Sequence, residues 1–143
     1  MSEGRVIRRS RIVGEFEGFD DDQLFLLDDG SAWLQDRYRY WYHYAYRPTA
    51  EIVRRDSRLY IEVCGQSIEV RETSVVAEGT IDGAFKGWHG DTEYTLTNGQ
   101  IWKQSASKYE YKYAYRPTAI VFESSSGTAM AVEGTTALVR RVR

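Results

Sequence analysis

Hydrophobic and polar residues alternate along most of this 143-residue chain, and a period of two residues predicts β-strands. No stretch of eleven or more residues carries the apolar stripe of a helix, which repeats about every 3.6 residues. In the C-terminal half, the segments 81–88, 92–96 and 100–104 fit strands bounded by turn residues. The pattern therefore predicts an all-β protein.

Asn98-Gly99 is the strongest hairpin signal in the chain, and Asp29-Gly30 is its counterpart in the first half. We expect a two-residue type I′ turn, whose central residues both have positive φ. In that register Leu96 faces one side of the sheet, and Trp102 and Gln104 face the other. A three- or four-residue loop with a bulge would break this assignment.

The chain contains a long internal repeat. Residues 44–50 and 113–119 both read YAYRPTA, and the same offset aligns 6–74 with 75–143 without a gap. The only two prolines, Pro48 and Pro117, then become equivalent, and each is expected to keep the preceding arginine extended. We predict a tandem duplication of a small SH3-like barrel, with β repeats at 6–74 and 75–143. Because each repeat is small, we expect the two to dock with a pseudo-twofold relation.

Tyrosines occupy alternate positions before each Arg-Pro pair, so in a strand their rings would form a ladder with steps of about 7 Å. Exposed rings would stack on bases, sugars or other flat groups, with arginine adding charged hydrogen bonds. The structural interpretation is that the ladders pack on the core or on each other. The candidate ligand-binding residues are Trp33, Gln35, Tyr40, Tyr42, Tyr44, Tyr46, Arg47, Trp102, Gln104, Tyr109, Tyr111, Tyr113, Tyr115 and Arg116.

The segment 96–104, LTNGQIWKQ, resembles the L-x-N-G-Q-x-W-x-Q signature of small bacterial proteins of unassigned function. The tyrosine run before Arg-Pro is similar to that group as well. The resemblance covers most of the second repeat, whereas the first repeat has Ser31 where the signature has its first Gln. It implies a small β-barrel from a bacterium and no particular chemistry.

The formal net charge of −2 excludes a generally basic nucleic-acid coat protein. Eight acids and no Lys or Arg lie within 15–36, whereas basic residues gather near both ends of the chain. Attraction between the acidic segment 15–36 and the basic ends of the chain would support self-association. The run Asp20-Asp21-Asp22 lacks the spacing of a calcium loop and is expected to be a solvated turn.

Residues for catalysis or metal binding are few. Cys64 is the only cysteine, which excludes an intrachain disulfide, and with His43 and His89 it falls short of a four-ligand zinc site. We expect Cys64 to be a strand-end residue, because it follows the predicted strand 60–63 and precedes Gly65. The sequence has no nucleophile motif and no Gly-rich phosphate loop. The sequence predicts no catalytic residues, no metal and no cofactor.

The N-terminus has no apolar segment typical of a secretory signal, so a cytoplasmic location is predicted. No apolar run approaches the roughly 20 residues of a membrane helix, so no membrane partner is expected. The sequence favours a non-enzymatic binding module for an unknown protein or polymer. The alternatives are a single-stranded nucleic-acid binder, a hydrolase acting on saccharide or peptide with a raised-pKa carboxyl group in a concave site, and a self-associating structural protein.

Overall fold

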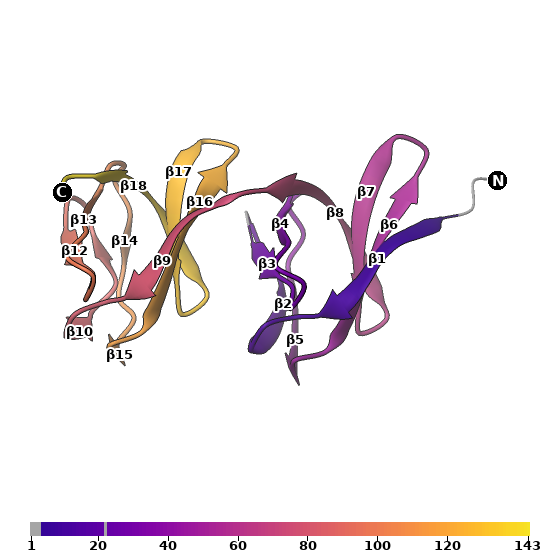
Figure 1. Cartoon of the computed structure of the whole chain (residues 1–143), viewed down its shortest axis with the longest axis horizontal. Helices are drawn as coiled ribbons and strands as arrows, with labels where there is room; N and C mark the ends of the chain where they lie inside the picture. Colours follow the sequence, from indigo (N-terminus) through magenta and orange to yellow (C-terminus); the bar gives the residue numbers. More distant parts are fainter. Residues whose placement is uncertain (1–3, 22) are drawn as a thin grey trace. The chain divides into compact units, whose positions relative to one another are not determined.

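The computed structural model describes residues 4–21 and 23–143, so Asp22 of the acidic run lies outside the described residues. Within them the regular structure is all β, as the alternation predicts, and no sheet closes into a barrel. The chain divides into two compact units, unit 1 (Met1–Ser74) and unit 2 (Val75–Arg143) (Figure 1). The described residues form no helix of the length and apolarity needed to cross a membrane.

Unit 1 consists of a six-stranded antiparallel sheet and a two-stranded ribbon. Across the sheet the strands are β1 (Arg5–Arg11), β6 (Thr49–Arg55), β7 (Arg58–Val63), β8 (Gln66–Thr73), β4 (Ala32–Gln35) and β3 (Leu24–Leu26). The ribbon pairs β2 (Glu15–Phe19) with β5 (Trp41–Tyr46). Aromatic side chains from both parts, among them Phe16, Phe19, Phe25 and Trp33, form one buried cluster.

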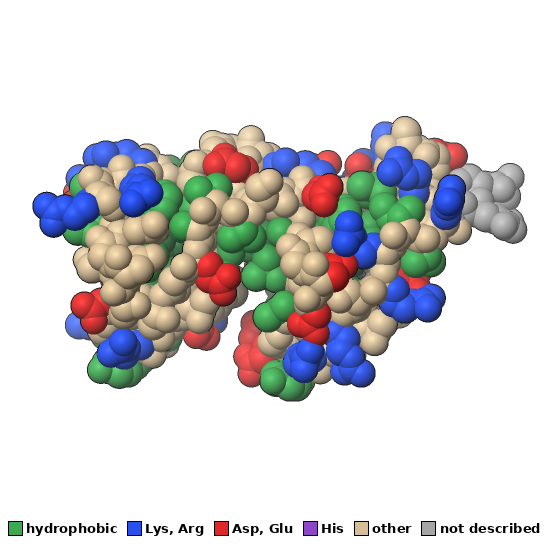
Figure 2. All heavy atoms as spheres, in the orientation of Figure 1, with side chains coloured by type: hydrophobic (Ala, Val, Ile, Leu, Met, Phe, Trp, Pro, Cys, Tyr) green, Lys and Arg blue, Asp and Glu red, His purple; other side chains and the backbone are tan. Residues whose placement is uncertain are grey.

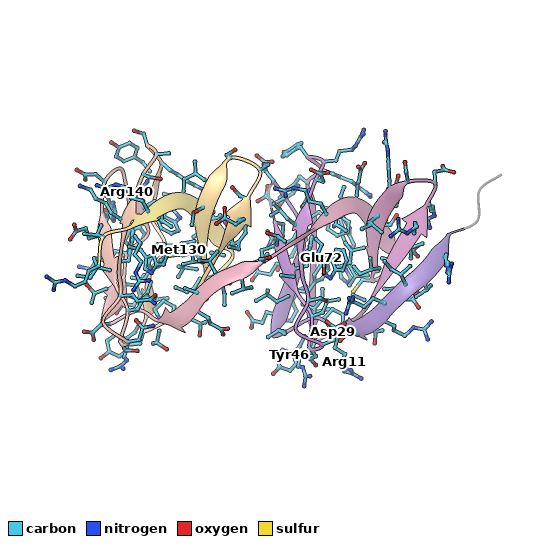
Figure 3. All side chains as sticks on the ribbon, turned by 45° about the horizontal axis from the view of Figure 1, so that its top comes forward. Arg11, Asp29, Tyr46, Glu72, Met130 and Arg140 are labelled. Atoms are coloured by element: carbon cyan, nitrogen blue, oxygen red, sulfur yellow. The ribbon has the colours of Figure 1, made fainter. Side chains whose placement is uncertain are left out.

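Unit 2 has the same strand order. Its sheet runs β9 (Val75–Thr80), β16 (Thr118–Ser124), β17 (Gly127–Val132), β18 (Thr135–Arg141), β13 (Ile101–Gln104) and β12 (Glu93–Thr95). The ribbon is split into two short pairs, β10 (Ala84–Phe85) with β15 (Ala114–Tyr115) and β11 (Trp88–His89) with β14 (Tyr109–Glu110). Phe85, Trp88 and Trp102 are buried in its core, and Met130 lies inside the unit (Figure 3).

The register of the β12–β13 hairpin differs from the type I′ expectation. Tyr94 pairs with Trp102, which leaves a three-residue loop at 97–99 in which Gly99 takes φ 92°. Neither Asn98 nor its counterpart in unit 1 has positive φ among the described residues. The type I′ prediction is therefore wrong, and the bulged loop puts Trp102 and Gln104 on the buried face together with Tyr94.

Asp29 closes the equivalent loop between β3 and β4. Its Oδ1 accepts hydrogen bonds from the backbone N–H of Ser31 (2.9 Å) and from the Ser31 hydroxyl (2.6 Å). Its Oδ2 lies 2.9 Å from Nη1 of Arg8. Partial desolvation works against ionisation of Asp29, but the bonds from Ser31 and Arg8 outweigh it and lower the pKa of the carboxyl group.

We expect Asp29 to contribute to the pH dependence of stability. Its folded pKa lies below the ordinary value of 3.8, so the carboxylate stabilises the fold above that value. The contribution disappears as the pH falls through the lowered folded pKa. Asp29→Asn should flatten this acid limb and cost less than about 1 kcal/mol near neutral pH, because the pair with Arg8 is partly exposed. Urea unfolding of both proteins across this range measures the difference, and an unchanged acid limb would contradict the assignment.

Candidate functional site

The ribbon of each unit presents one face to the core and the other to solvent. In unit 1, Phe16 pairs with Ala45 on the core side, whereas Glu15 pairs with Tyr46 on the outer side. In unit 2, Phe85 pairs with Ala114 on the core side, and Ala84 pairs with Tyr115 on the outer side. Strand alternation thus places the tyrosine rings outside, because the intervening positions face the core.

The tyrosines are exposed in both units. Relative exposure is 51–68% for Tyr40, Tyr42, Tyr44 and Tyr46, and 57–75% for Tyr109, Tyr111, Tyr113 and Tyr115. The expectation that these rings pack on the core is therefore wrong. The core-facing positions of the ribbons are filled by phenylalanine, alanine and tryptophan, which leaves the tyrosines no buried site. Figure 3 shows Tyr46 pointing away from the ribbon.

The unit 1 tyrosine face, defined as Tyr42, Tyr44, Tyr46, Glu15 and Glu17, is acidic. The hydroxyl of Tyr44 donates to Oε1 of Glu15 over 3.3 Å. Partial desolvation together with the negative charges of Glu15 and Glu17 raises the pKa of Tyr44. Among the described residues no Lys or Arg forms an ion pair with either glutamate.

The unit 2 tyrosine face, defined as Tyr109, Tyr111, Tyr113, Tyr115, Lys86 and Arg116, carries the opposite charge. Lys86 occupies the position equivalent to Glu17, and Ala84 replaces Glu15. Both Lys86 and Arg116 are exposed, and neither forms an ion pair with a described residue. Figure 2 shows hydrophobic side chains beside charges of both signs near β10 and β15 and also near β2 and β5.

The two arginines that end the tyrosine strands differ in their charge partners. Arg47 forms an ion pair with Asp28, but the residue equivalent to Asp28 in unit 2 is Thr97, so Arg116 lacks that partner. Both arginines adopt positive φ, 48° and 50°, which corrects the expectation that proline keeps them extended. The backbone N–H of Arg47 donates to the carbonyl of Gly14 (2.9 Å), and this bond holds the corner in the unusual conformation.

The predicted tryptophans and glutamines do not reach these faces. Trp33, Gln35, Trp102 and Gln104 are all 2–4% exposed. The Trp33 indole donates to the Ser31 hydroxyl over 2.9 Å, which satisfies its polar edge within the hairpin. All four residues therefore support the fold, and the exposed site consists of the tyrosines and their charged neighbours.

Gln104 connects three backbone segments of unit 2. Its Oε1 accepts from the N–H groups of His89 (3.2 Å) and Gly90 (3.1 Å), and its Nε2 donates to the carbonyls of Ala106 (3.0 Å) and Lys108 (2.9 Å). These bonds anchor the loop that leads into Tyr109. Gln35 does the same in unit 1, where its side chain bonds Asp20 and the carbonyl of Arg37 (2.8 Å).

Glycine allows the ribbon strands to approach each other closely. Gly18 and Gly87 have φ of 100° and 95°, and a Cβ atom on either would lie 1.9–2.0 Å from a carbonyl oxygen of the tyrosine strand. In unit 2 the hydroxyl of Tyr94 donates to the carbonyl of Gly87 over 2.7 Å. A side chain at either position would push the tyrosine strand away from its partner.

The basic strand β1 and the acidic segment meet within unit 1. Arg8 pairs with Asp29, and Arg9 pairs with Glu51 on the neighbouring strand. These ion pairs neutralise part of the positive charge that the sequence places near the N-terminal end of the chain. Charged residues on the ribbons, such as Glu17 and Lys86, form no ion pair with a described residue, so they indicate the charge of a partner better than the paired residues of β1 do.

The remaining reactive side chains do not cluster. His43 stacks on Trp41 with ring centroids 5.2 Å apart, and Cys64 forms a two-residue turn with Gly65, with φ of 51° and 81°. Partial burial raises the pKa of the Cys64 thiol, which disfavours the thiolate. Within residues 4–21 and 23–143, no three His, Cys, Asp or Glu side chains come together as a metal site.

A shallow hollow of about 280 Å³ lies beside the unit 2 tyrosine face. Its lining includes Lys86, His89, Thr92 and Glu93, and it is open to solvent.

Sequence reasoning missed Glu15, Glu17 and Lys86, because their proximity to the tyrosines depends on which strand pairs with the ladder. The inversion from Glu17 to Lys86 at the repeat offset was the available signal.

Comparisons of the chain with protein-family models, curated proteins and solved structures gave no significant match. The resemblance to small bacterial proteins therefore stays a prediction.

Proposed function

We propose that this protein is a non-enzymatic interaction module that binds a protein or polymer partner through its two tyrosine faces. The observation that carries this proposal is the exposure of the tyrosine side chains, which is above one half at every ladder position from Tyr40 to Tyr46 and from Tyr109 to Tyr115. Tyrosine supplies a large contact area at low entropic cost and is enriched in binding surfaces. Contiguous exposed aromatic rings typically mark an interaction site.

We also propose that the chain arose as a tandem duplication of one SH3-like unit. The equal strand order of the two sheets and the recurrence of YAYRPTA at the same structural position support this origin. The buried glutamines and the close-approach glycines also recur at the repeat offset. Duplication would leave two binding faces of common origin, free to diverge in charge.

Single-stranded nucleic acid is the weaker candidate for the partner. Lys86 and Arg116 beside the unit 2 rings would suit phosphates, but Glu15 and Glu17 on the unit 1 face would repel them. Only one of the two faces therefore suits a nucleic acid. A protein partner can satisfy both faces.

Photo-crosslinking of the full chain in its native cells tests the proposed function. A benzophenone amino acid replaces Tyr44 or Tyr113 on the faces, and Ser57 or Ser126 in control proteins. The two serines are exposed hairpin residues at equivalent repeat positions, away from the ribbons. We expect adducts at the tyrosine positions in at least about tenfold excess over the serine positions, because hot spots concentrate at aromatic residues. Equal adduct yields, or none at the faces, would contradict the proposal.

A further inference from the structure

We propose that the partner of each tyrosine face is a second copy of this chain, with the unit 1 face of one copy bound to the unit 2 face of the next. This inference rests on the proposed function, since it assigns the occupant of the same surfaces. It commits to one arrangement, in which contact joins unlike faces.

The two faces lie on corresponding ribbons, and the charged residues at the ends of their tyrosine rows differ in sign. On the unit 1 face, Glu15 and Glu17 form no ion pair with a described residue, and Arg47 is neutralised by Asp28. Arg11, whose Nη1 lies 3.4 Å from the Arg47 carbonyl oxygen, is the one cation at this corner that pairs with no described acid, so the glutamates outnumber it. On the unit 2 face, Lys86 and Arg116 form no ion pair with a described residue, while two exposed acids, Asp82 and Glu93, line the hollow next to Lys86 outside the tyrosine row. The one ribbon glutamate there, Glu110, accepts a bond from the Thr135 hydroxyl (2.7 Å) and lies 3.7 Å from Nζ of Lys108, so it is already engaged.

Whole-unit charges point the same way. Residues 1–74 contain 11 Lys and Arg against 14 Asp and Glu, whereas residues 75–143 contain 8 against 7. Unit 1 is therefore net negative and unit 2 net positive. Attraction between unlike units steers their encounter, and contact between two unit 1 faces would place unpaired glutamates against each other.

The aromatic rings would supply the contact area and the charges would select the pairing. Rows of tyrosines on the two ribbons can interleave, because each row repeats at the step of a β-strand. The hollow beside Lys86 offers space for a side chain of the opposing face. A contact between unlike faces is heterologous, so association continues until a ring closes or a filament grows.

Sedimentation velocity of the full chain over a range of concentrations tests the proposal. At low ionic strength, we expect the mean mass to rise with concentration to that of a closed dimer or beyond it. About 0.5 M salt should weaken the association at least about tenfold, because it screens exposed charges within a few ångströms. A monomer at every concentration and salt would overturn the inference. So would an excess mass that nuclease removes, because the partner would then be nucleic acid.

Charge reversal with complementation identifies the faces. The variant E15K/E17K has two basic faces, and the variant K86E/R116E has two acidic ones, so each alone should be monomeric. An equimolar mixture should associate again, since every contact between the two variants joins unlike faces. The control E72K/E78K makes the same change in net charge as E15K/E17K at exposed glutamates outside both faces, and should associate like the wild type. Association of either single variant, or a mixture that stays monomeric, would refute the face-to-face pairing.

This outcome is separable from that of the proposed function. Adducts at Tyr44 and Tyr113 to a different molecule, together with a monomer in sedimentation, would refute self-association and leave the interaction module standing. Absent or unselective adducts would refute the module itself. Self-association predicts that adduct masses equal multiples of the chain mass, and that E15K/E17K removes them.

Discussion

Gln104→Glu should destabilise unit 2 by roughly 3–5 kcal/mol near neutral pH. The substitution removes both N–H donors that hold the carbonyls of Ala106 and Lys108. It also buries a carboxylate at a position that is 3% exposed. The loop before Tyr109 would lose its anchor, so the first strand of the unit 2 tyrosine ladder should open together with the local core.

The loss of stability in Gln104→Glu should become smaller as the pH falls. Burial against carbonyl oxygens would raise the folded pKa of the new carboxyl group above its unfolded value of about 4.3. The neutral acid is then preferred in the folded state, so the variant recovers stability below that value and loses it as the pH rises. Urea unfolding of the full chain, followed by hydrogen exchange of amides in 104–110, measures both effects.

Gln100→Glu is the matched control. Gln100 accepts a hydrogen bond from Nε1 of Trp102 over 3.2 Å, and its amide nitrogen donates to no described residue. A carboxylate can keep that acceptor role at a half-buried site, so a change within about 1 kcal/mol is expected. Equal losses for the two variants would show that the donor pair of Gln104 does not anchor the loop.

Gly87→Ala should cost about 3 kcal/mol or more. The alanine Cβ would lie 2.0 Å from the carbonyl oxygen of Glu110 and 2.7 Å from the amide nitrogen of Lys112. Backbone atoms cannot yield as a flexible side chain can, so the ribbon must separate. Hydrogen exchange in β14 and β15 should accelerate, and the midpoint of urea unfolding should fall.

Gly83→Ala separates this steric effect from backbone strain. Gly83 has φ of 87°, close to the 95° of Gly87, but a Cβ there would meet nothing within 4 Å. This control should lose only about 1–2 kcal/mol, the cost of a left-handed conformation for an alanine. If the two substitutions were equally costly, close approach of the strands would not be the reason for the glycine at 87.

Local sequence patterns were sufficient to predict the strands and to predict that the tyrosines of each ladder lie on the same face of their strand. Alternation from Trp41 to Tyr46 predicts that the even positions share a face, and β5 has that arrangement. The pattern was insufficient to say whether the face is buried, because tyrosine is amphipathic and is found in both settings. That choice depended on which side of the ribbon the phenylalanines of β2 and β10 packed.

Two local predictions failed for reasons of tertiary structure. The Asn98-Gly99 hairpin has a bulged three-residue loop because that register buries Tyr94, Trp102 and Gln104 together, and burial of large side chains outweighs a turn preference. Arg47 adopts positive φ because the corner between β5 and β6 is held by its bond to Gly14. The residues that Trp102 packs against and the carbonyl that Arg47 bonds lie outside the local segments on which the two predictions were based.

The amino-acid sequence by itself determined the strand content, the internal repeat and the presence of two tyrosine ladders, because alternation and self-similarity are properties of the chain order. Only the tertiary structure decided that the ladders are solvent-exposed, that the tryptophans and glutamines are buried, and that Glu15 and Glu17 lie beside the tyrosines of one face and Lys86 beside those of the other. These features depend on which strands pair and which side of each ribbon meets the core. Residues far apart in the chain set both choices, through the area they bury and the hydrogen bonds they satisfy.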